Sequence, residues 1–227
     1  MDKTEPIEYL ILHHDPAPAV LLVQPVDEHD MQGMDSLIGY IRGNCGVPFV
    51  LAAVPVEDWN RDLSPWEAPA VFGDQAFGAG AAKTLECIEN IVIPGVLGEL
   101  GLPEDIPVVL GGYSLAGFFS LWASYRTERF AGVCAASPSV WFPGWMDYAR
   151  QHAPLAGCVY LSLGDREEKT RNRTMAAVGE CIREQYRLLG GPAAENAVLE
   201  WNQGNHFKEP DIRTAKGFVW CVERVCK

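Results

Sequence analysis

The chain has 227 residues, of which 48% are hydrophobic and 21% charged, so it is long and apolar enough to bury one substantial core. Its formal net charge is −12, and the basic residues are scattered along the chain rather than clustered. Nucleic acids and anionic membranes both require a concentrated positive surface. We therefore expect a single domain over residues 1–227 that binds neither nucleic acid nor membranes.

No segment has the pattern of a secretory leader or a membrane span. Residues 1–5 are polar, whereas a leader needs basic residues followed by an apolar stretch. The longest apolar runs, such as residues 19–23 and 108–112, are far too short to cross a bilayer. The seven cysteines form no C-x-x-C pair. That usage predicts reduced thiols, no metal site and a cytoplasmic protein.

Short apolar runs alternate with longer helical patterns along the chain. The apolar runs predict strands at residues 19–23, 49–54, 108–111, 132–136, 159–163 and 198–201. The helical patterns predict helices at residues 35–42, 81–99 (kinked or broken at Pro94), 115–126, 174–189 and 215–225. Residues 55–77 are expected to be irregular, and His13 and His14 to lie in a solvated turn. Continuously apolar strands separated by helices predict an α/β fold with a doubly wound, mostly parallel sheet.

Residues 108–123 combine an apolar strand, two glycines, a single serine and an amphipathic helix. A nucleophile elbow has this layout, because its serine occupies a strained strand-to-helix turn that tolerates only small neighbours two residues away on each side. Gly112 and Ala116 hold those two positions, although the second is usually glycine. Ser114 is therefore the predicted nucleophile, against the alternative of an incidental serine. The backbone N–H of Leu115, at a helix N-terminus, is one predicted oxyanion donor.

A serine nucleophile needs a base beside it and an acid that orients the base. In this type of fold the order along the chain is serine, acid, histidine. Two histidines follow Ser114: His206 in a Gly/Asn loop after the last predicted strand, and His152 in a surface loop. His206 is the predicted base. The acid is expected after the preceding strand, where Glu167 is favoured and Asp165 is the alternative.

These segments together resemble the α/β hydrolases of the esterase D and siderophore-esterase group, the enterochelin-esterase-like proteins. The resemblance covers most of the chain and is carried by residues 60–66, 112–117, 137–141, 163–167 and 204–206. It implies an α/β-hydrolase domain without a large cap, with short lid loops, that hydrolyses carboxylic esters. It also implies that a second oxyanion N–H lies near residues 56–58, at Val56 or Glu57. No cofactor is implied.

Several aromatic residues fall in two loops that are expected to overhang the carboxyl edge of the sheet, where such folds bind ligands. Trp59, Trp66 and Trp141, with Phe142 and Trp145, are predicted either to line an acyl or aryl pocket or to pack within a lid. The working hypothesis is a serine esterase that acts on a small-molecule ester. The alternatives are a thioesterase or acyltransferase with the same triad, and a catalytically silent hydrolase-like binding protein. The oligomeric state is not predicted.

Overall fold

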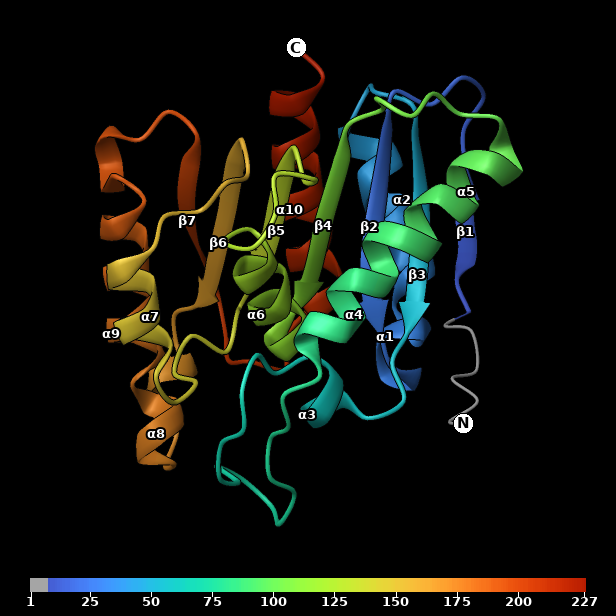
Figure 1. Ribbon diagram of the computed structural model, residues 1–227. Helices are drawn as coiled ribbons and strands as arrows, with labels where there is room; N and C mark the ends of the chain where they lie inside the picture. Colours follow the sequence, from blue (N-terminus) through green and yellow to red (C-terminus); the bar gives the residue numbers. More distant parts are fainter. Residues whose placement is uncertain (1–7) are drawn as a thin grey trace, which may run out of the picture.

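The computed structural model describes residues 8–227, so the polar residues 1–5 discussed above lie outside it. A seven-stranded sheet in the order β1-β3-β2-β4-β5-β6-β7 runs through its centre (Figure 1). β1 pairs with β3 in antiparallel fashion, and all the other neighbouring strands are parallel. The predicted α/β class and mostly parallel sheet are confirmed.

All six predicted strands are present, and one more precedes them. The strands are β1 (Leu10–His14), β2 (Val20–Val26), β3 (Phe49–Pro55), β4 (Val108–Tyr113), β5 (Gly132–Ala136), β6 (Cys158–Gly164) and β7 (Ala197–Asn202). Every residue of β2, β4, β5 and β6 is buried, which explains why their sequences are mostly apolar. The expectation of a solvated turn at His13 and His14 is wrong: both lie in β1, a half-exposed edge strand without a clear apolar pattern.

Helices cover both faces of the sheet. They are α1 (Glu28–Gln32), α2 (Met34–Asn44), α3 (Trp59–Asp62), α4 (Ala81–Cys87), α5 (Ile93–Leu100), α6 (Ser114–Ala123), α7 (Trp145–Gln151), α8 (Arg173–Ala176), α9 (Val178–Leu188) and α10 (Pro210–Val225). α2 and α10 pack on one face, whereas α4, α5, α6, α7 and α9 lie over the other (Figure 1). None of the helices within residues 8–227 is long and apolar enough to span a membrane.

The predicted helix at residues 81–99 is interrupted by a π-helical turn, η1 (Ile88–Val92), between α4 and α5. Pro94 stands in the first turn of α5, where it leaves one helical carbonyl without its N–H partner, and the wider π turn before it accommodates the proline ring. The predicted helix at residues 174–189 is likewise divided into α8 and α9. The short helices α1, α3 and α7 were not predicted.

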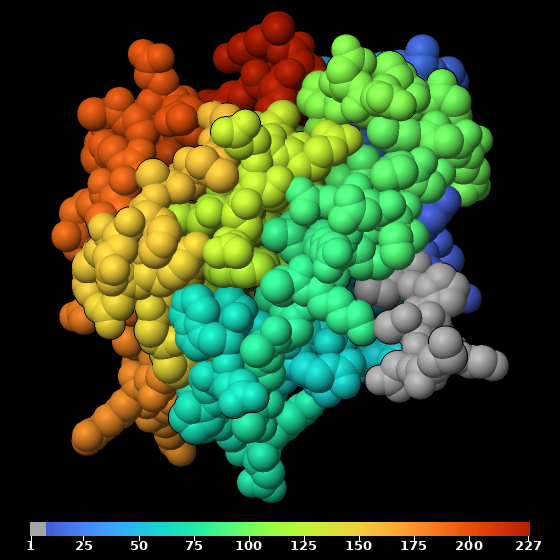
Figure 2. Space-filling model, viewed as in Figure 1, coloured from blue at the N-terminus to red at the C-terminus, as the bar shows by residue number. Residues whose placement is uncertain are grey.

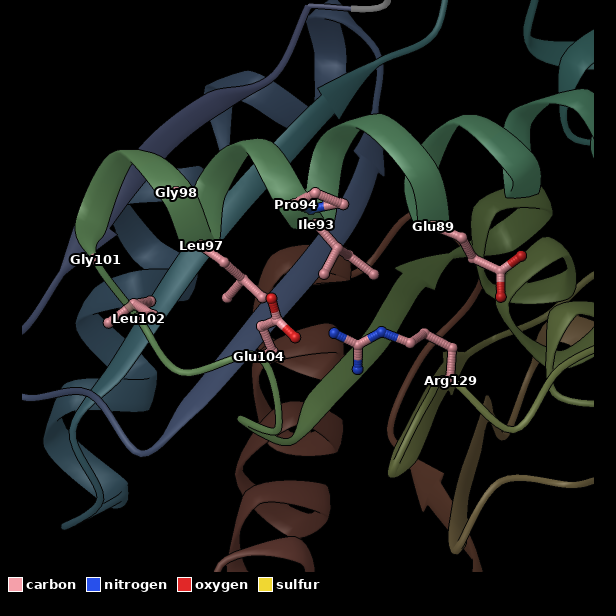
Figure 3. Close-up of a pocket in the computed structure, with 9 residues that line it drawn as sticks. All are labelled: Glu89, Ile93, Pro94, Leu97, Gly98, Gly101, Leu102, Glu104 and Arg129. Carbon is pink, nitrogen blue, oxygen red and sulfur yellow. The ribbon is translucent and has the colours of Figure 1, made fainter.

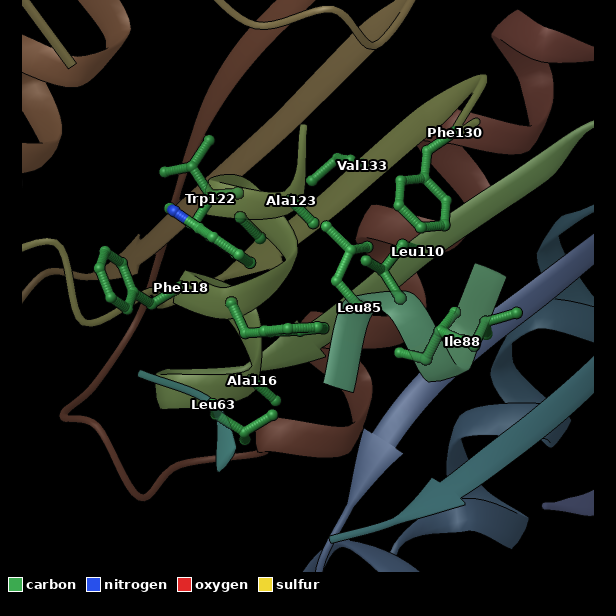
Figure 4. Packing of buried hydrophobic residues seen from close by; sticks show 14 of the residues in the cluster. Leu63, Leu85, Ile88, Leu110, Ala116, Phe118, Trp122, Ala123, Phe130 and Val133 are labelled. Atoms are coloured by element: carbon green, nitrogen blue, oxygen red, sulfur yellow. The ribbon is translucent and has the colours of Figure 1, made fainter. Parts of the chain in front are cut away.

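The core beneath α6 connects this helix, which begins at Ser114, to the segment that follows β3. Figure 4 shows side chains of α4, α6, β4 and β5 converging there, together with Leu63, which directly follows α3. Leu63 is fully buried and so anchors the start of the long connection between α3 and α4. That connection projects beyond the carboxyl edge of the sheet (Figures 1 and 2) and contains an isolated bridge between Ala68 and Phe77.

Candidate active site

Ser114 lies at the junction where β4 turns directly into α6, at the carboxyl edge of the sheet. Its φ of 55° is in the left-handed region, which costs free energy for any residue with a Cβ atom and so marks a strained turn. A Cβ atom on Gly112 would lie 2.7 Å from the Cβ atom of Ala116, and one on Gly117 would lie 2.8 Å from the carbonyl oxygen of Gly112. Both glycines are therefore required for this turn to close, with Ala116 already filling the available space.

Side chains from three separate strand ends form one chain of hydrogen-bonding groups. The Oγ atom of Ser114 lies 2.9 Å from Nε2 of His206. The Nδ1 atom of His206 lies 2.7 Å from Oε2 of Glu167. Parallel strands place their carboxyl ends at one edge, so residues that follow β4, β6 and β7 come together there although 92 residues separate Ser114 from His206. His152 lies elsewhere, as the exposed cap of α7.

Two neighbouring carboxylates were candidates for the residue that contacts His206, and they have different partners. Glu167 contacts the imidazole, whereas Asp165 is exposed and accepts a 2.8 Å hydrogen bond from the backbone N–H of Gly204. Glu168 turns away from the site and pairs with Arg183. Asp165 thus fastens the loop that carries His206 without touching the imidazole.

Glu167 is almost completely buried, with 4% of its side chain exposed. Its second oxygen, Oε1, accepts hydrogen bonds from the backbone N–H of Gly164 at 2.7 Å, from Ser137 Oγ at 2.8 Å and from Arg213 Nη1 at 2.9 Å. A buried carboxylate is stable only when it is paired and hydrogen-bonded, and these donors meet that requirement. Ser137, at the end of β5, is a second non-glycine residue with positive φ (41°), so strain occurs at two strand ends of this site.

Some of the backbone amides expected to donate to an oxyanion already have another hydrogen-bond acceptor, and others do not. Leu115 occupies the first turn of α6, where its N–H has no partner within the helix. The N–H of Val56 donates to the carbonyl of Val26 at 3.0 Å, which extends the β2–β3 pairing and removes it as a free donor. The N–H of Asp58 is directed at its own helix, 3.3 Å from Asp62 Oδ2. Within the described residues Glu57 N–H has no such partner.

The five aromatic residues of the two loops divide into packed and partly exposed groups. Trp145 is fully buried and donates from Nε1 to Gln185, and Phe142 is buried against Phe118. These two residues therefore belong to the core. Trp59, Trp66 and Trp141 are partly exposed.

Hydrogen bonds join the two overhanging loops to each other and to α8. Trp66 Nε1 donates to the carbonyl of Pro143 at 2.8 Å. Asn172, the cap of α8, donates to the carbonyl of Val71 at 2.6 Å. The connection between α3 and α4 is thus held at two points above the carboxyl edge. Among residues 8–227, no group of three or more His, Cys, Asp or Glu side chains is arranged to hold a metal ion.

Two surface hollows lie at opposite edges of the sheet. The larger, of about 560 Å³, is lined by α5 and by Glu104 and Arg129, which precede β4 and β5 (Figure 3). That position is the amino edge, remote from Ser114. A hollow of about 300 Å³ at the carboxyl edge is lined by Tyr113 and Phe207, the chain neighbours of Ser114 and His206, and by Asp30 of α1.

Asp30 is expected to make stability depend on pH. Burial, and next the charge of Asp27, raise the pKa of Asp30 from 3.8 to about 6. Because this folded-state pKa lies above the unfolded value, the free energy of unfolding falls as pH rises from about 4 to 6. Above that range it falls no further on account of Asp30. Asp30→Asn keeps a side-chain acceptor for the Asp27 N–H and removes the charge. We expect it to raise the free energy of unfolding at pH 7 by about 1–3 kcal/mol, with no gain at pH 3.5.

Urea denaturation at the two pH values measures this difference. Asp35→Asn, at an exposed position of α2, is the control and should change the unfolding free energy little at either pH. An equal gain for Asp30→Asn at both pH values would show that the carboxylate charge is not the cause.

The contacts that Arg213, Tyr113 and Ser137 make in this site were not predicted from the sequence. Arg213 precedes the predicted helix at residues 215–225, but α10 begins at Pro210 and includes it. It stands four residues before Gly217 and eight before Cys221, both on the buried face of that helix. The helical spacing of Arg213 with these buried residues could have predicted that it faces the core.

No protein-family model and no curated protein matches the sequence. Solved structures do match. An IroE-like serine hydrolase from Shewanella oneidensis has a TM-score of 0.75 at 16% identity, over 94% of this chain and 75% of that one. Siderophore hydrolase EstB from Aspergillus nidulans has a TM-score of 0.67 at 16% identity, over 96% and 95% of the chains. The enterobactin and salmochelin hydrolase IroE has a TM-score of 0.64 at 18% identity, over 97% and 89%.

At these identities the comparison establishes a shared fold. The α/β-hydrolase fold expected from the sequence is therefore confirmed over nearly the whole length of this chain. The resemblance carried by a few short motifs extends, in three dimensions, to the arrangement of all the major elements.

Proposed function

We propose that this protein is a serine esterase that hydrolyses carboxylic esters through an acyl-enzyme on Ser114. One observation carries the proposal: the unbroken series of contacts from Ser114 Oγ to His206 and on to the buried Glu167, at 2.9 and 2.7 Å. A serine hydroxyl is a weak nucleophile unless a base lies within hydrogen-bonding distance and a third group orients that base. The three side chains satisfy both distance requirements in a resting site.

In the first half of the reaction, Ser114 Oγ attacks the ester carbonyl carbon while His206 Nε2 takes the hydroxyl proton. His206 then returns that proton to the departing alcohol, and the acyl group stays on Ser114. Glu167 accepts from Nδ1–H throughout, which keeps Nε2 in the tautomer that accepts a proton and stabilises the imidazolium that forms. Water activated by His206 releases the acid in the second half.

The negative oxygen of the tetrahedral intermediate needs donors that are already in place. The N–H of Leu115, at the start of α6, is the first, and the helix dipole adds to its effect. We assign the second to the N–H of Glu57, which is free of the pairing that occupies Val56. In comparable sites each such donor contributes about 3 kcal/mol to the transition state.

The substrate is proposed to be a small-molecule ester. Two of the structural neighbours named above are described as siderophore hydrolases or as a hydrolase of enterobactin and salmochelin. Trp59, at the start of α3, and Trp66 and Trp141, in the loops near the carboxyl edge, are all partly exposed and are proposed to contact its acyl or aryl part.

A fluorophosphonate probe tests the proposal directly, because it phosphonylates only an activated serine. We expect one adduct, mapped to Ser114 by peptide mass spectrometry, together with hydrolysis of p-nitrophenyl acetate. His206→Ala should abolish labelling, whereas His152→Ala, the matched control at the exposed C-terminal cap of α7, should leave it unchanged. A folded protein that acquires no adduct at Ser114 and hydrolyses no ester of a p-nitrophenyl panel would refute the proposal.

A further inference from the structure

Arg213, in the first turns of α10, is a charged residue held inside the protein, with 2% of its surface exposed. One amino group, Nη1, donates to Glu167 Oε1 at 2.9 Å and to the Tyr113 hydroxyl at 3.1 Å. The other, Nη2, donates to the carbonyl oxygens of Gln203 and Asn205 at 3.2 and 3.1 Å. Its guanidinium therefore contacts a carboxylate, a phenol and two points of the loop before His206.

Those contacts join the three segments that carry the proposed reacting groups. Tyr113 immediately precedes Ser114, and its hydroxyl donates to the carbonyl of His206 at 2.7 Å. Gln203 and Asn205 flank Gly204, whose φ of 114° gives the loop its turn towards the site. Glu167 is the carboxylate on His206. A single buried side chain thus fixes the end of β4, the loop after β6 and the loop after β7.

The guanidinium also places a permanent positive charge behind Glu167. Arginine keeps its proton under all ordinary conditions, so its charge is constant over the range in which enzymes are assayed. A buried ion pair is commonly no more stabilising than apolar side chains of the same volume, so stability alone does not account for it. The negative charge of Glu167 is shared between Arg213 on Oε1 and His206 on Oε2.

We propose that Arg213 is a positioning residue that orients Glu167 and the His206 loop and whose positive charge disfavours protonation of His206, keeping the base available at lower pH. This inference rests on the proposed esterase function. Without the guanidinium, Glu167 would stabilise the imidazolium alone, and His206 would hold its proton, and be unable to accept another, up to a higher pH.

Other charged or titratable groups surround the same region, and their partners differ. Glu167 has ion pairs with His206 and Arg213 among the described residues. Burial, and next the charge of Glu167, raise the pKa of Tyr113 to about 12, so the phenol stays neutral during an assay. The β6 and β7 loops, α1 and the start of α10 carry further charged or titratable groups: Asp165, Arg166, Glu168, Lys208, Glu209, Asp211, His29 and Asp30.

Arg213→Met tests the inference, because methionine fills similar space without charge or donors. We expect kcat for p-nitrophenyl acetate to fall at least about 100-fold, as positioning of His206 is lost. We also expect the acidic limb of the kcat/KM profile to move to higher pH by about one unit. Arg213→Lys keeps the charge and should keep the limb in place, with kcat lowered by the loss of the forked contacts. Arg183→Met, which removes an exposed arginine paired with Glu168, is the control and should change neither quantity.

A second comparison keeps the inference testable if Arg213→Met leaves Glu167 unpaired and the protein unfolded. The double variant Arg213→Met/Glu167→Gln removes both buried charges and is compared with Glu167→Gln alone, using the pH dependence of fluorophosphonate labelling. The acidic limb of the labelling profile is again expected at higher pH in the variant that lacks Arg213. An unshifted limb in both comparisons, with wild-type protein active, would overturn this inference and leave the esterase proposal standing. An inactive, unlabelled wild type would overturn both.

Discussion

Replacing Ser114 with alanine is expected to lower kcat for p-nitrophenyl acetate by about 10⁶-fold while the protein remains folded. The substitution removes the oxygen that lies 2.9 Å from His206 Nε2 and leaves the other contacts of the site in place. Alanine and serine both carry a Cβ atom, so the strain of a φ of 55° is the same in the two proteins. Steady-state kinetics measures the loss, and thermal unfolding followed by circular dichroism measures the fold.

The matched control is Ser36→Ala, on the exposed side of α2, which should leave both kcat and the melting temperature unchanged. A folded Ser114→Ala protein with activity within tenfold of the wild type would place the nucleophile elsewhere.

Glu167→Gln is expected to lower kcat by about 10⁴-fold. Glutamine keeps the shape of the side chain but lacks the negative charge that stabilises the imidazolium of His206. Its amide NH₂ would also face either His206 or Arg213, both of which are donors here. The effect should appear in kcat rather than KM, because Glu167 contacts the base and not the proposed substrate site.

Asp165→Asn provides the comparison, since the two carboxylates are two residues apart. Asparagine retains an oxygen that can accept from Gly204 N–H, so kcat should change no more than a few-fold. The reverse ranking, with Asp165→Asn the more damaging substitution, would make Asp165 the acid of the triad.

The grouping of Ser114, His206 and Glu167 could be predicted because it follows from local pattern and topology. The elbow is encoded in adjacent residues, and Gly112 and Gly117 are required because a Cβ atom at either position would come within 2.7 or 2.8 Å of its neighbours. Loops after parallel strands meet at one edge, which brings His206 to Ser114. The choice between the two acids followed a weaker signal, because it depends on the short 3-10 turn at Glu167–Lys169 that tucks Glu167 inwards.

Other features depend on neighbours that are distant in the sequence. The Val56 N–H is occupied because β3 lies beside β2, where the carbonyl of Val26 accepts from it. The residues around position 56 do not reveal which strand is the neighbour of β3. β1 is half-exposed at the edge of the sheet, so it lacks the apolar run that marked the other strands. Burial of Arg213 is possible only because Glu167 and two loop carbonyls meet it there.

The position of Arg213 and His206 within one continuous segment has a consequence for the making of the protein. Ribosomes deliver the chain from its N-terminus, so the strained elbow of β4 and α6 emerges long before the loop and helix that supply the base and the guanidinium. α10 packs across β4, β5 and β6, and its docking is the step that brings Arg213 against Glu167. Until α10 is made, the nascent chain has Ser114 without His206 and Arg213 beside it, so under the proposed mechanism this serine would not yet react.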